Sequence, residues 1–572
     1  MQQLGNAGCT GTRPWEFLDE YRGKAFQGEW PTLPEMYRIS VSRFGQRPCF
    51  TVYEPGRISL NYEESLKRIE AAARWLHERG IRKDDTIAVT GKNSPEWAIA
   101  YLGILFAGAT VVPIDYQLKN SEADLLIKTS KAKILFVDEE KYAYYAELGL
   151  PGELVSLKKG IGTYVYDLDG PPAEIEQPRE DDLAAVLFTS GTMGKPKGVM
   201  LTHKNLVSDC YLAQGTPFNV YPTDVFYVLL PLHHAYAMQA TFIEPLSQGG
   251  EAVFGKKMVT QVMLKELKLG KINVLLGVPM LFNKLLAGIL RGVRAKGVFV
   301  YGIITVLMGI SGFIKKIFKV NPGKKFFHAV LEQASLSTLR VCICGGGPLA
   351  SSVFRKYNQL GIDFVQGYGL TETSPIINLN PVEHYKETSV GKVVPGADMK
   401  ILNPDKRGIG EVIIKGPMVM KGYFEMPEET AASFTEEGYL KTGDLGYLDD
   451  ENYLYLTGRA KNMIVTEGGK NVYPEEIENE FQLFEEIDQI LVRSFTEGKK
   501  ARAELIEALV YPNPDFKWAE GPVDKEIIKT RINAIIGEVN QRLLPYQRIA
   551  RTVVLDEPME MTTTKKIKRD TL

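Results

Sequence analysis

A run of small, hydroxyl-bearing and cationic residues follows directly after the apolar segment 183–188. Glycines let backbone N–H groups turn toward a ligand without steric cost, while Ser, Thr and Lys side chains add donors and charge. The pattern predicts a strand that leads into a phosphate-binding loop. Because Gly194-Lys195 is followed by Pro196 and not by Ser or Thr, an ordinary P-loop ATPase is disfavoured. The candidate phosphate ligands are Thr189, Ser190, Gly191, Thr192, Gly194, Lys195 and Lys197.

Further motifs follow this loop along the chain. They are Pro231-Leu232-His233-His234, Gly345-Gly346-Gly347-Pro348-Leu349, Gln366-Gly367-Tyr368-Gly369-Leu370-Thr371-Glu372-Thr373, Tyr439-Leu440-Lys441-Thr442-Gly443-Asp444, Gly458-Arg459-Ala460-Lys461 and Thr564-Lys565-Lys566-Ile567. In content and order they resemble the motifs of the adenylate-forming superfamily, which includes acyl-CoA synthetases, luciferases and peptide-synthetase adenylation domains. The resemblance extends over about residues 35–570, nearly the whole chain.

The resemblance implies two half-reactions. A carboxylate attacks the α-phosphate of ATP, which gives an acyl-adenylate and pyrophosphate, and a thiol, expected to be CoA, then attacks the acyl carbon. Such chemistry depends on positioning and charge stabilisation. The loop Thr189–Lys197 would hold the leaving phosphates, Thr371 would contact the α-phosphate, and Glu372 would bind Mg²⁺, a hard cation that prefers carboxylate oxygens.

The same resemblance assigns residues to the adenine and the ribose of the nucleotide. Tyr368 would lie against adenine, and Asp444 would accept both ribose hydroxyls with Arg459 assisting, since a carboxylate can accept two hydroxyl donors. The remaining candidates in the nucleotide site are Gly345, Gly346, Gly347, Gln366, Gly367 and Gly369. Taken alone, Tyr368 would be a core aromatic residue and Asp444 a turn residue; the series of motifs favours the nucleotide roles.

Near the C-terminus, Lys566 matches the family's mobile lysine, which would bridge the attacking carboxylate and the α-phosphate. The family usually has a glycine before this lysine and here Lys565 stands there, so Lys565 is the alternative, and a solvated basic face is a third interpretation. Rotation about a hinge at Lys461 would withdraw Lys566 after adenylation and bring Gly468, Gly469 and Lys470 to the thiol tunnel.

The segment Pro231–Tyr236 gives information about which carboxylic acid is the substrate. In this segment His234 would line the acyl pocket, and His233 is expected to pack in the core. This segment has no Asp or Glu to pair with a substrate ammonium, which disfavours peptide-synthetase chemistry. We expect a medium- to long-chain fatty-acid:CoA ligase that uses ATP, Mg²⁺ and CoA. A ligase that transfers the acyl group to acyl carrier protein is the alternative, and a non-catalytic AMP or acyl-AMP binding protein is a third possibility.

The uncharged segment Gly297–Ile314 has cations on both sides, including Arg294, Lys296, Lys315 and Lys316. A single membrane span is excluded, because site residues before and after it must meet on one side of the membrane. Two interpretations stay open: a buried helical insertion, or a helix that lies in or dips into a lipid surface. Long-chain synthetases carry additions in this region, so the resemblance favours a lipid-like acyl substrate.

Elements that must position these residues are visible in the hydrophobic pattern. Predicted strands 86–90 and 110–114 alternate with helices that begin near Asn61 and Ser94, which indicates parallel sheets covered by helices. We expect an α/β fold with a small β-rich subdomain after 390, followed by a small mobile α+β domain. The expected boundaries are an extension at 1–30, an AMP-binding domain at 31–458 with an apolar insertion at 290–330, and a C-terminal domain at 459–572.

Bulk composition agrees with an ordinary globular enzyme. The 572 residues are 44% hydrophobic and 24% charged with a net charge of −2, so no global field favours nucleic acid. Five cysteines do not form a disulfide framework, Cys342 and Cys344 are expected in a buried strand, and the six histidines show no metal-ligand spacing. No signal-peptide pattern is present at the N-terminus, so we expect a cytoplasmic protein, peripheral on a membrane if 297–320 contacts lipid.

Overall fold

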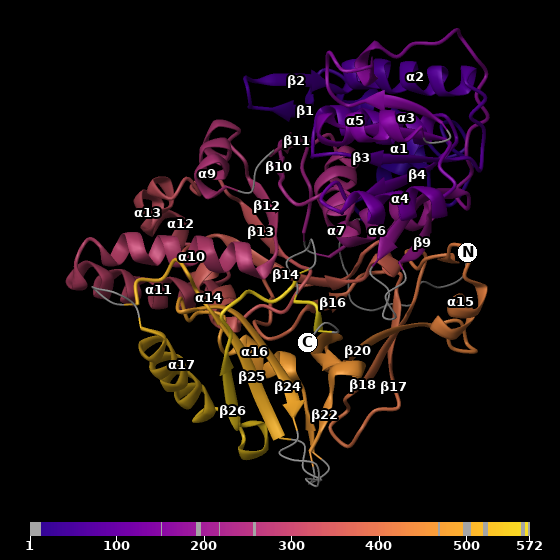
Figure 1. Ribbon diagram of the computed structural model, residues 1–572. Coiled ribbons are helices and arrows are strands. Elements are labelled where there is room, and N and C mark those ends of the chain that lie inside the picture. Colours follow the sequence, from indigo (N-terminus) through magenta and orange to yellow (C-terminus); the bar gives the residue numbers. More distant parts are fainter. Residues whose placement is uncertain are drawn as a thin grey trace.

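The computed structural model describes residues 13–149, 152–189, 196–216, 218–255, 259–466, 470–495, 505–518, 524–561 and 567–569. These residues form two large sheets with helices between and around them, and a smaller C-terminal unit (Figure 1). The expected α/β architecture is confirmed. The first part of the described chain, with the 3-10 helix η1 (Glu16–Glu20), is packed onto the core through buried Leu18 and Phe26.

The first sheet has eight strands in the order β19-β9-β8-β4-β3-β5-β6-β7. The pairs that involve β3 to β7 and the β4·β8 pair are parallel, while β8·β9 and β9·β19 are antiparallel. The strands are β3 (Thr86–Thr90), β4 (Thr110–Ile114), β5 (Ile134–Val137), β6 (Glu153–Ser156), β7 (Thr163–Tyr164), β8 (Leu183–Thr189), β9 (Lys197–Thr202) and β19 (Gly422–Tyr423).

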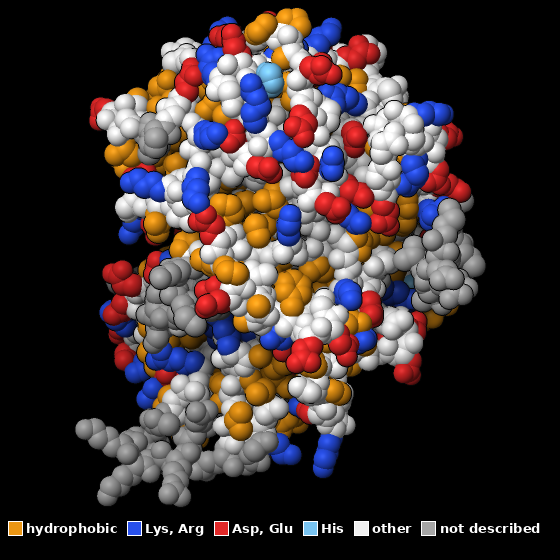
Figure 2. Space-filling model, turned by 90° about the vertical axis from the view of Figure 1, so that its right-hand side faces the viewer, with side chains coloured by type: hydrophobic (Ala, Val, Ile, Leu, Met, Phe, Trp, Pro, Cys, Tyr) orange, Lys and Arg blue, Asp and Glu red, His pale blue; other side chains and the backbone are white. Residues whose placement is uncertain are grey.

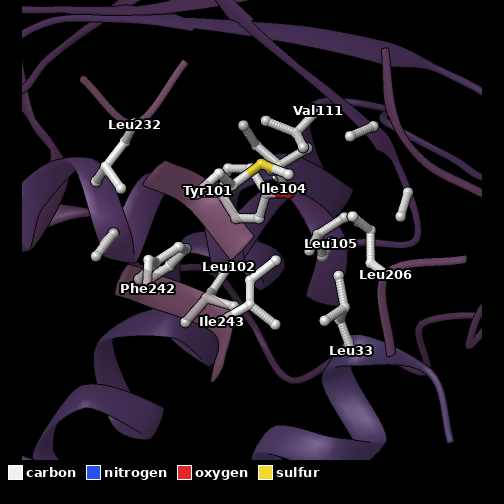
Figure 3. Packing of buried hydrophobic residues seen from close by; sticks show 14 of the residues in the cluster. Leu33, Tyr101, Leu102, Ile104, Leu105, Val111, Leu206, Leu232, Phe242 and Ile243 are labelled. Atoms are coloured by element: carbon white, nitrogen blue, oxygen red, sulfur yellow. Dashed lines mark hydrogen bonds between the residues drawn. The ribbon is translucent and has the colours of Figure 1, made fainter. Parts of the chain in front are cut away.

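Helix α3 (Pro95–Phe106) lies at the centre of the largest core. Ser94 caps it by accepting a hydrogen bond from the Trp97 N–H, and Pro95 occupies its first turn, as the sequence predicts. It is apolar on all sides because it packs on β3 and β4 of one sheet and on β1 of the other. Its side chains meet Leu33, Leu206, Leu232 and Phe242 from four other segments (Figure 3). The flanking helices are α1 (Leu33–Phe44), α2 (Tyr62–Glu78), α4 (Asn120–Thr129), α5 (Glu139–Leu148) and α6 (His203–Gln214).

The second sheet has thirteen strands in the order β17-β18-β20-β21-β16-β15-β14-β13-β12-β10-β11-β1-β2. Pairing is parallel from β14 to β1 and antiparallel from β14 to β17. The expected β-rich subdomain is therefore the antiparallel half of a continuous sheet. The strands are β1 (Pro48–Val52), β2 (Ile58–Asn61), β10 (Val225–Val228), β11 (Glu251–Phe254), β12 (Val274–Gly277), β13 (Val341–Cys344), β14 (Asp363–Gly369), β15 (Ile376–Leu379), β16 (Gly391–Val393), β17 (Asp398–Leu402), β18 (Gly410–Lys415), β20 (Leu440–Leu448) and β21 (Tyr453–Arg459).

Short and long helices connect the remaining strands of the two sheets. The segment 298–318 forms one continuous helix, α11, which packs against α10 and α14 at the left of Figure 1. Only 17% of its most apolar window is buried, so the interpretation as a buried insertion is wrong. The helices are η2 (Val165–Asp167), α7 (Ala235–Ala237), η3 (Met238–Ile243), α8 (Glu244–Ser247), α9 (Thr260–Leu269), α10 (Pro279–Arg294), α11 (Val298–Phe318), α12 (Gly323–Phe326), α13 (His328–Gln333), α14 (Ser351–Gln359), η4 (Thr371–Thr373) and α15 (Pro427–Ser433).

After β21 the chain enters a unit with its own hydrophobic core, which includes Ile477, Val492, Ala508 and Ile535. Strands β24 and β25 pair antiparallel and β25 and β26 pair parallel, which gives the expected mixture of helix and strand. The boundary at 459 and the mobility of this unit stay predictions. Its elements are η5 (Ala460–Asn462), β22 (Ile464–Val465), β23 (Asn471–Val472), α16 (Pro474–Asn479), β24 (Ile487–Phe495), β25 (Leu505–Pro512), α17 (Lys525–Asn540), η6 (Pro545–Gln547) and β26 (Arg551–Val554).

Candidate nucleotide and acid site

Parallel pairing brings two of the predicted motifs to one edge of the second sheet. β12, β13 and β14 are neighbours that run in the same direction, so their carboxyl ends lie together. Gly345 follows β13 and Thr371 follows β14 at this edge. Cys342 and Cys344 are fully buried in β13, as expected. Ligand sites of α/β sheets form at such carboxyl ends, which supports a binding role for both loops.

Asp444 connects the two halves of the second sheet. Tyr368 Oη donates a hydrogen bond to Asp444 Oδ2 at 2.6 Å, and Arg459 Nε lies 3.0 Å from Asp444 Oδ1. Asp444 and Arg459 are opposite each other in the β20·β21 pair. Asp444 raises the pKa of the Arg459 guanidinium, with smaller contributions from Tyr368, Glu372 and Glu475. Burial and then Asp444 raise the pKa of Tyr368, so its hydroxyl stays a donor.

Glu372 is held by contacts from the first sheet's edge strand. Its Oε1 accepts a hydrogen bond from Tyr423 Oη at 3.0 Å, and its backbone carbonyl accepts one from Met420 N at 2.9 Å. The ammonium of Lys197 lies 4.8 Å from the centre of the Tyr423 ring. Tyr423 is placed there because β19 pairs with β9, with Tyr423 opposite Val199. The carboxylate of Glu372 therefore stands close to the strand that begins at Lys197.

Two glycines of the motifs are closely packed: Gly369 has no room for a side chain and Gly345 has little. A Cβ on Gly345 would lie 3.0 Å from Cζ of Tyr236, whose hydroxyl donates to the Ile343 carbonyl at 3.0 Å. A Cβ on Gly369 would overlap the carbonyl oxygen of Pro375. Gly346 and Gly347 follow β13, Gly367 lies within β14, and the Gln366 carbonyl accepts a hydrogen bond from Asn380 N. Close packing accounts for Gly345 and Gly369 independently of any ligand.

The two adjacent histidines have different surroundings. The side chain of His233 is 9% exposed, its Nε2 lies 3.4 Å from Asp115 Oδ2, and burial lowers its pKa to about 3. The expectation that His233 packs in the core is therefore consistent with the structure. His234 precedes α7 and its ring centre lies 4.1 Å from that of His233. The side chain of Asn93 fixes the segment that precedes the two histidines, since it donates a hydrogen bond to the Leu230 carbonyl at 2.8 Å.

The C-terminal unit contacts the loop after β13. Gln482 Nε2 donates to the Pro348 carbonyl at 2.9 Å, and its Oε1 accepts from Ala350 N at 2.8 Å. Lys461 lies in η5, next to Asn462, whose side chain donates to Glu475 Oε1 at 2.6 Å. Lys470 is exposed, and its backbone N–H donates to Thr466 Oγ1 at 3.2 Å. In this arrangement Gln482 contacts the loop after β13, a candidate part of the nucleotide site.

Several predicted residues lie outside the described residues: Ser190, Gly191, Thr192, Gly194, Lys195, Gly468, Gly469, Lys565 and Lys566. The flanks of two of these segments are described. Thr189 and Lys197 are paired across β8·β9, and Met561 and Ile567 form an antiparallel bridge. Lys568 lowers the pKa of Glu560, with a smaller contribution from Lys119 at the start of α4. The bridge between Met561 and Ile567 therefore lies in a part of the C-terminal unit that is near the start of α4.

Sequence reasoning missed the residues that support the candidate ligands. Tyr423, Asn93 and Gln482 touch the predicted motifs but belong to none of them, Tyr236 was given no role within its segment, and Asp115 places a carboxylate beside His233. No local pattern marks them. Among the described residues no group of three or more His, Cys, Asp or Glu is placed to hold a metal ion. A cation at Glu372 would need oxygen ligands from the substrate.

Three comparisons with known proteins identify what the chain is similar to. The sequence pattern of the AMP-binding enzyme family matches residues 37–424. A feruloyl-CoA synthase of Amycolatopsis sp is 29% identical over 79% of this chain and 82% of its own length. A long-chain-fatty-acid–CoA ligase of Bacillus subtilis (strain 168) is 26% identical over 94% of this chain and 93% of its own. The fold is that of ATP-bound MatB from Rhodopseudomonas palustris, with a TM-score of 0.73, 23% identity and coverage of 95% and 98% of the two chains.

Proposed function

Because this chain belongs to the AMP-binding enzyme family, we propose that it activates a medium- to long-chain fatty acid with ATP and transfers the acyl group to CoA. The carboxylate oxygen attacks the α-phosphorus, the bond to the β-phosphate breaks, and pyrophosphate leaves. The CoA sulfur then attacks the acyl carbon, and AMP leaves. Both relatives carry the names of enzymes that join an acid to CoA, so the acyl-CoA ligase class is the broader part of the proposal and the chain length its finer part.

The single observation that carries the proposal is the convergence of Tyr368, Asp444 and Arg459 at 2.6 and 3.0 Å. Asp444 would accept the ribose hydroxyls, with the Arg459 guanidinium beside its carboxylate. The loop Gly345–Gly347 and Tyr368 would border the base. Thr371 and the segment Thr189–Lys197 would face the phosphates, with Lys566 offsetting charge when the carboxylate meets the α-phosphate.

Glu372 fits a magnesium ion that is also bound by phosphate oxygens. Its carboxylate is half-buried and fixed at one oxygen by Tyr423, and Mg²⁺ in phosphate sites is commonly bound by one or two carboxylates plus the substrate. The ion would neutralise charge on the phosphates when bound. Glu372 is the residue that would hold it, and Lys197 beside Tyr423 would add positive charge at the same end of the site.

The acyl preference rests on two observations. The relative that covers nearly all of both chains is a long-chain-fatty-acid–CoA ligase. The carboxylate that the structure adds near His234 belongs to Asp115, which is buried beside His233 and so is not offered to a substrate ammonium. The feruloyl-CoA synthase favours an aryl acid as the second candidate substrate, within the same reaction.

Pyrophosphate release from Mg·ATP, measured across acetate to oleate plus ferulate and benzoate, with and without CoA, tests the proposal. We expect a maximum at long alkyl chains and formation of acyl-CoA by chromatography. A maximum at ferulate would replace the fatty acid by an aryl acid. Pyrophosphate release without CoA consumption would favour transfer to an acyl carrier protein, and no release with any acid would overturn the enzymatic proposal in favour of nucleotide binding.

A further inference from the structure

Helix α11 exposes an apolar surface along its whole length. Phe299 is 90% exposed, Phe313 64% and Phe318 65%. Among the described residues α11 is the one helix that is long and apolar enough to cross a membrane. Large exposed apolar surfaces of this kind mark interaction sites. The other exposed apolar side chains of the helix are Val298, Val300, Ile303, Val306, Leu307, Ile310 and Ile317.

The opposite face of α11 is fixed to the protein. Met308, Ser311 and Lys315 are buried, with the spacing of one helical face, and α11 packs against α10 and α14. Lys315 Nζ lies 2.6 Å from Asp363 Oδ1 and 2.7 Å from Asn358 Oδ1. This buried ion pair and the packing hold the helix flat on the domain. α11 therefore does not span a bilayer, although its length would permit it.

The charged residues of α11 and of the segments next to it in sequence have one sign, although Asp363 pairs with Lys315 and Glu485 with Arg291. The segment 267–331 contains no Asp or Glu, although the chain has 70 acidic residues. The cations of this segment are Lys268, Lys271, Lys284, Arg291, Arg294, Lys296, Lys315, Lys316, Lys319, Lys324 and Lys325. The face seen in Figure 2 differs, because acidic and basic side chains alternate over it. An apolar strip bordered by cations matches a surface with an apolar interior and anionic groups at its boundary.

We propose that α11 docks the enzyme on the surface of an anionic lipid bilayer. The helix lies parallel to the membrane, with Phe299, Phe313 and Phe318 inserted at the boundary between headgroups and acyl chains. Lys296 and Lys316 reach the lipid phosphates, with their alkyl stems against apolar surface. The protein is then peripheral, since its other face stays in water.

Docking through α11 would place the bilayer one helix away from the nucleotide loop. α10 has 16 residues, or about 24 Å, and connects the α11 end of the domain to Pro279. Pro279 Cγ lies 3.5 Å from the position of a Cβ on Gly347. An insoluble acid would have a short path from lipid to the site, which deepens the proposed function. The docking itself does not depend on which acid is activated.

Vesicle co-sedimentation of the full chain tests the proposal. We expect binding to vesicles of phosphatidylcholine and phosphatidylglycerol, at least tenfold weaker binding to phosphatidylcholine alone, and weaker binding at high salt. The double variant Phe299→Glu/Phe313→Glu is expected to lose binding at least tenfold. The matched control Leu125→Glu/Ile527→Glu alters exposed apolar residues elsewhere and should bind as the parent does. Equal binding of the parent and the Phe double variant would overturn the proposal.

A second measurement keeps the proposal testable if the charged variant fails to fold. Phe299→Trp is a conservative change at an exposed site, and its fluorescence, taken as a difference from the parent, should shift to the blue with anionic vesicles. An unchanged spectrum would overturn the proposal.

Sedimentation equilibrium would reveal a second copy of the chain as the occupant of the α11 surface. A dimer that Phe299→Glu dissociates, without vesicle binding by the parent, would replace the lipid interpretation. Pyrophosphate release with a soluble acid reports the proposed function separately.

Discussion

Tyr368 and Asp444 are joined by a 2.6 Å hydrogen bond between residues 76 positions apart, one from β14, where the second sheet changes from parallel to antiparallel pairing, and the other from β20. The candidate nucleotide site is therefore closed by a contact between two strands that are not neighbours in the sheet. The contact leaves Asp444 Oδ1 to Arg459, so each oxygen of the carboxylate is oriented before a ligand binds.

Replacing Asp444 by Asn should lower kcat/KM for ATP about 10- to 100-fold, since hydrogen bonds to a charged group contribute about 1.5–3 kcal/mol. Tyr368→Phe keeps the carboxylate and should have a smaller effect. Pyrophosphate release at varied ATP concentration measures both. Asp450→Asn, in the exposed turn after β20, is the control; if Asp450→Asn and Asp444→Asn had equal effects, a ribose role for Asp444 would be ruled out.

Removal of the charge in Glu372→Gln should lower the adenylation rate at least about 100-fold, because the carboxylate is proposed to bind Mg²⁺. Tyr423→Phe removes only the hydrogen bond to Oε1, worth about 1 kcal/mol, and should raise the Mg²⁺ concentration for half-maximal rate roughly fivefold. Titration of Mg²⁺ at fixed ATP checks both. Glu425→Gln, an exposed carboxylate near Tyr423 in sequence, should match the parent.

Alanine at Gly369 and at Gly347 should separate folding from ligand binding. A Cβ at Gly369 overlaps a backbone carbonyl, so Gly369→Ala should lower the free energy of unfolding by about 1–3 kcal/mol. At Gly347 the nearest atom is 3.5 Å away, so Gly347→Ala should stay within about 0.5 kcal/mol of the parent yet raise KM for ATP. Chemical denaturation and steady-state kinetics give the two quantities. A normal KM for Gly347→Ala would remove this glycine from the nucleotide site.

Glu244 should make stability depend on pH. Burial raises its pKa from 4.5 to about 8, so the folded state holds a proton that the unfolded chain releases near 4.5. The stabilisation is complete below the unfolded pKa and is lost as pH rises through about 8. Glu244→Gln should flatten the fall in melting temperature between pH 6.5 and 8.5. Asp209, whose pKa is raised by burial and then by Glu244, titrates in the same direction, so some slope should remain.

Exposed Glu436→Gln is the control for that experiment and should keep the slope of the parent. A slope for Glu244→Gln equal to that of the parent would mean that Glu244 does not hold the proton. Differential scanning calorimetry with intact protein supplies the melting temperatures.

Local signals in the sequence predicted the parts of the fold that local physics decides. The caps at Asn61 and Ser94 and the buried strand at Cys342 are set by neighbouring residues, and the structure has all three. The joining of the antiparallel strands to β14 was not predicted, because strand order depends on contacts between distant segments. Tyr423 and Asp115 were not predicted to lie at the site for the same reason, because each reaches it by strand pairing or packing between distant segments. Hydropathy detected α11 but could not show which side of it is covered.

The junction at β14 also bears on how the protein is made. A growing chain that has reached residue 380 contains the strands of the parallel half, but the Tyr368 hydroxyl still lacks its acceptor, and Arg459 follows 15 positions after Asp444. Both sheets can therefore begin to assemble during synthesis before Asp444, the proposed ribose acceptor, has been made. If Asp444 has this role, affinity for ATP arises only once β20 and β21 have emerged from the ribosome.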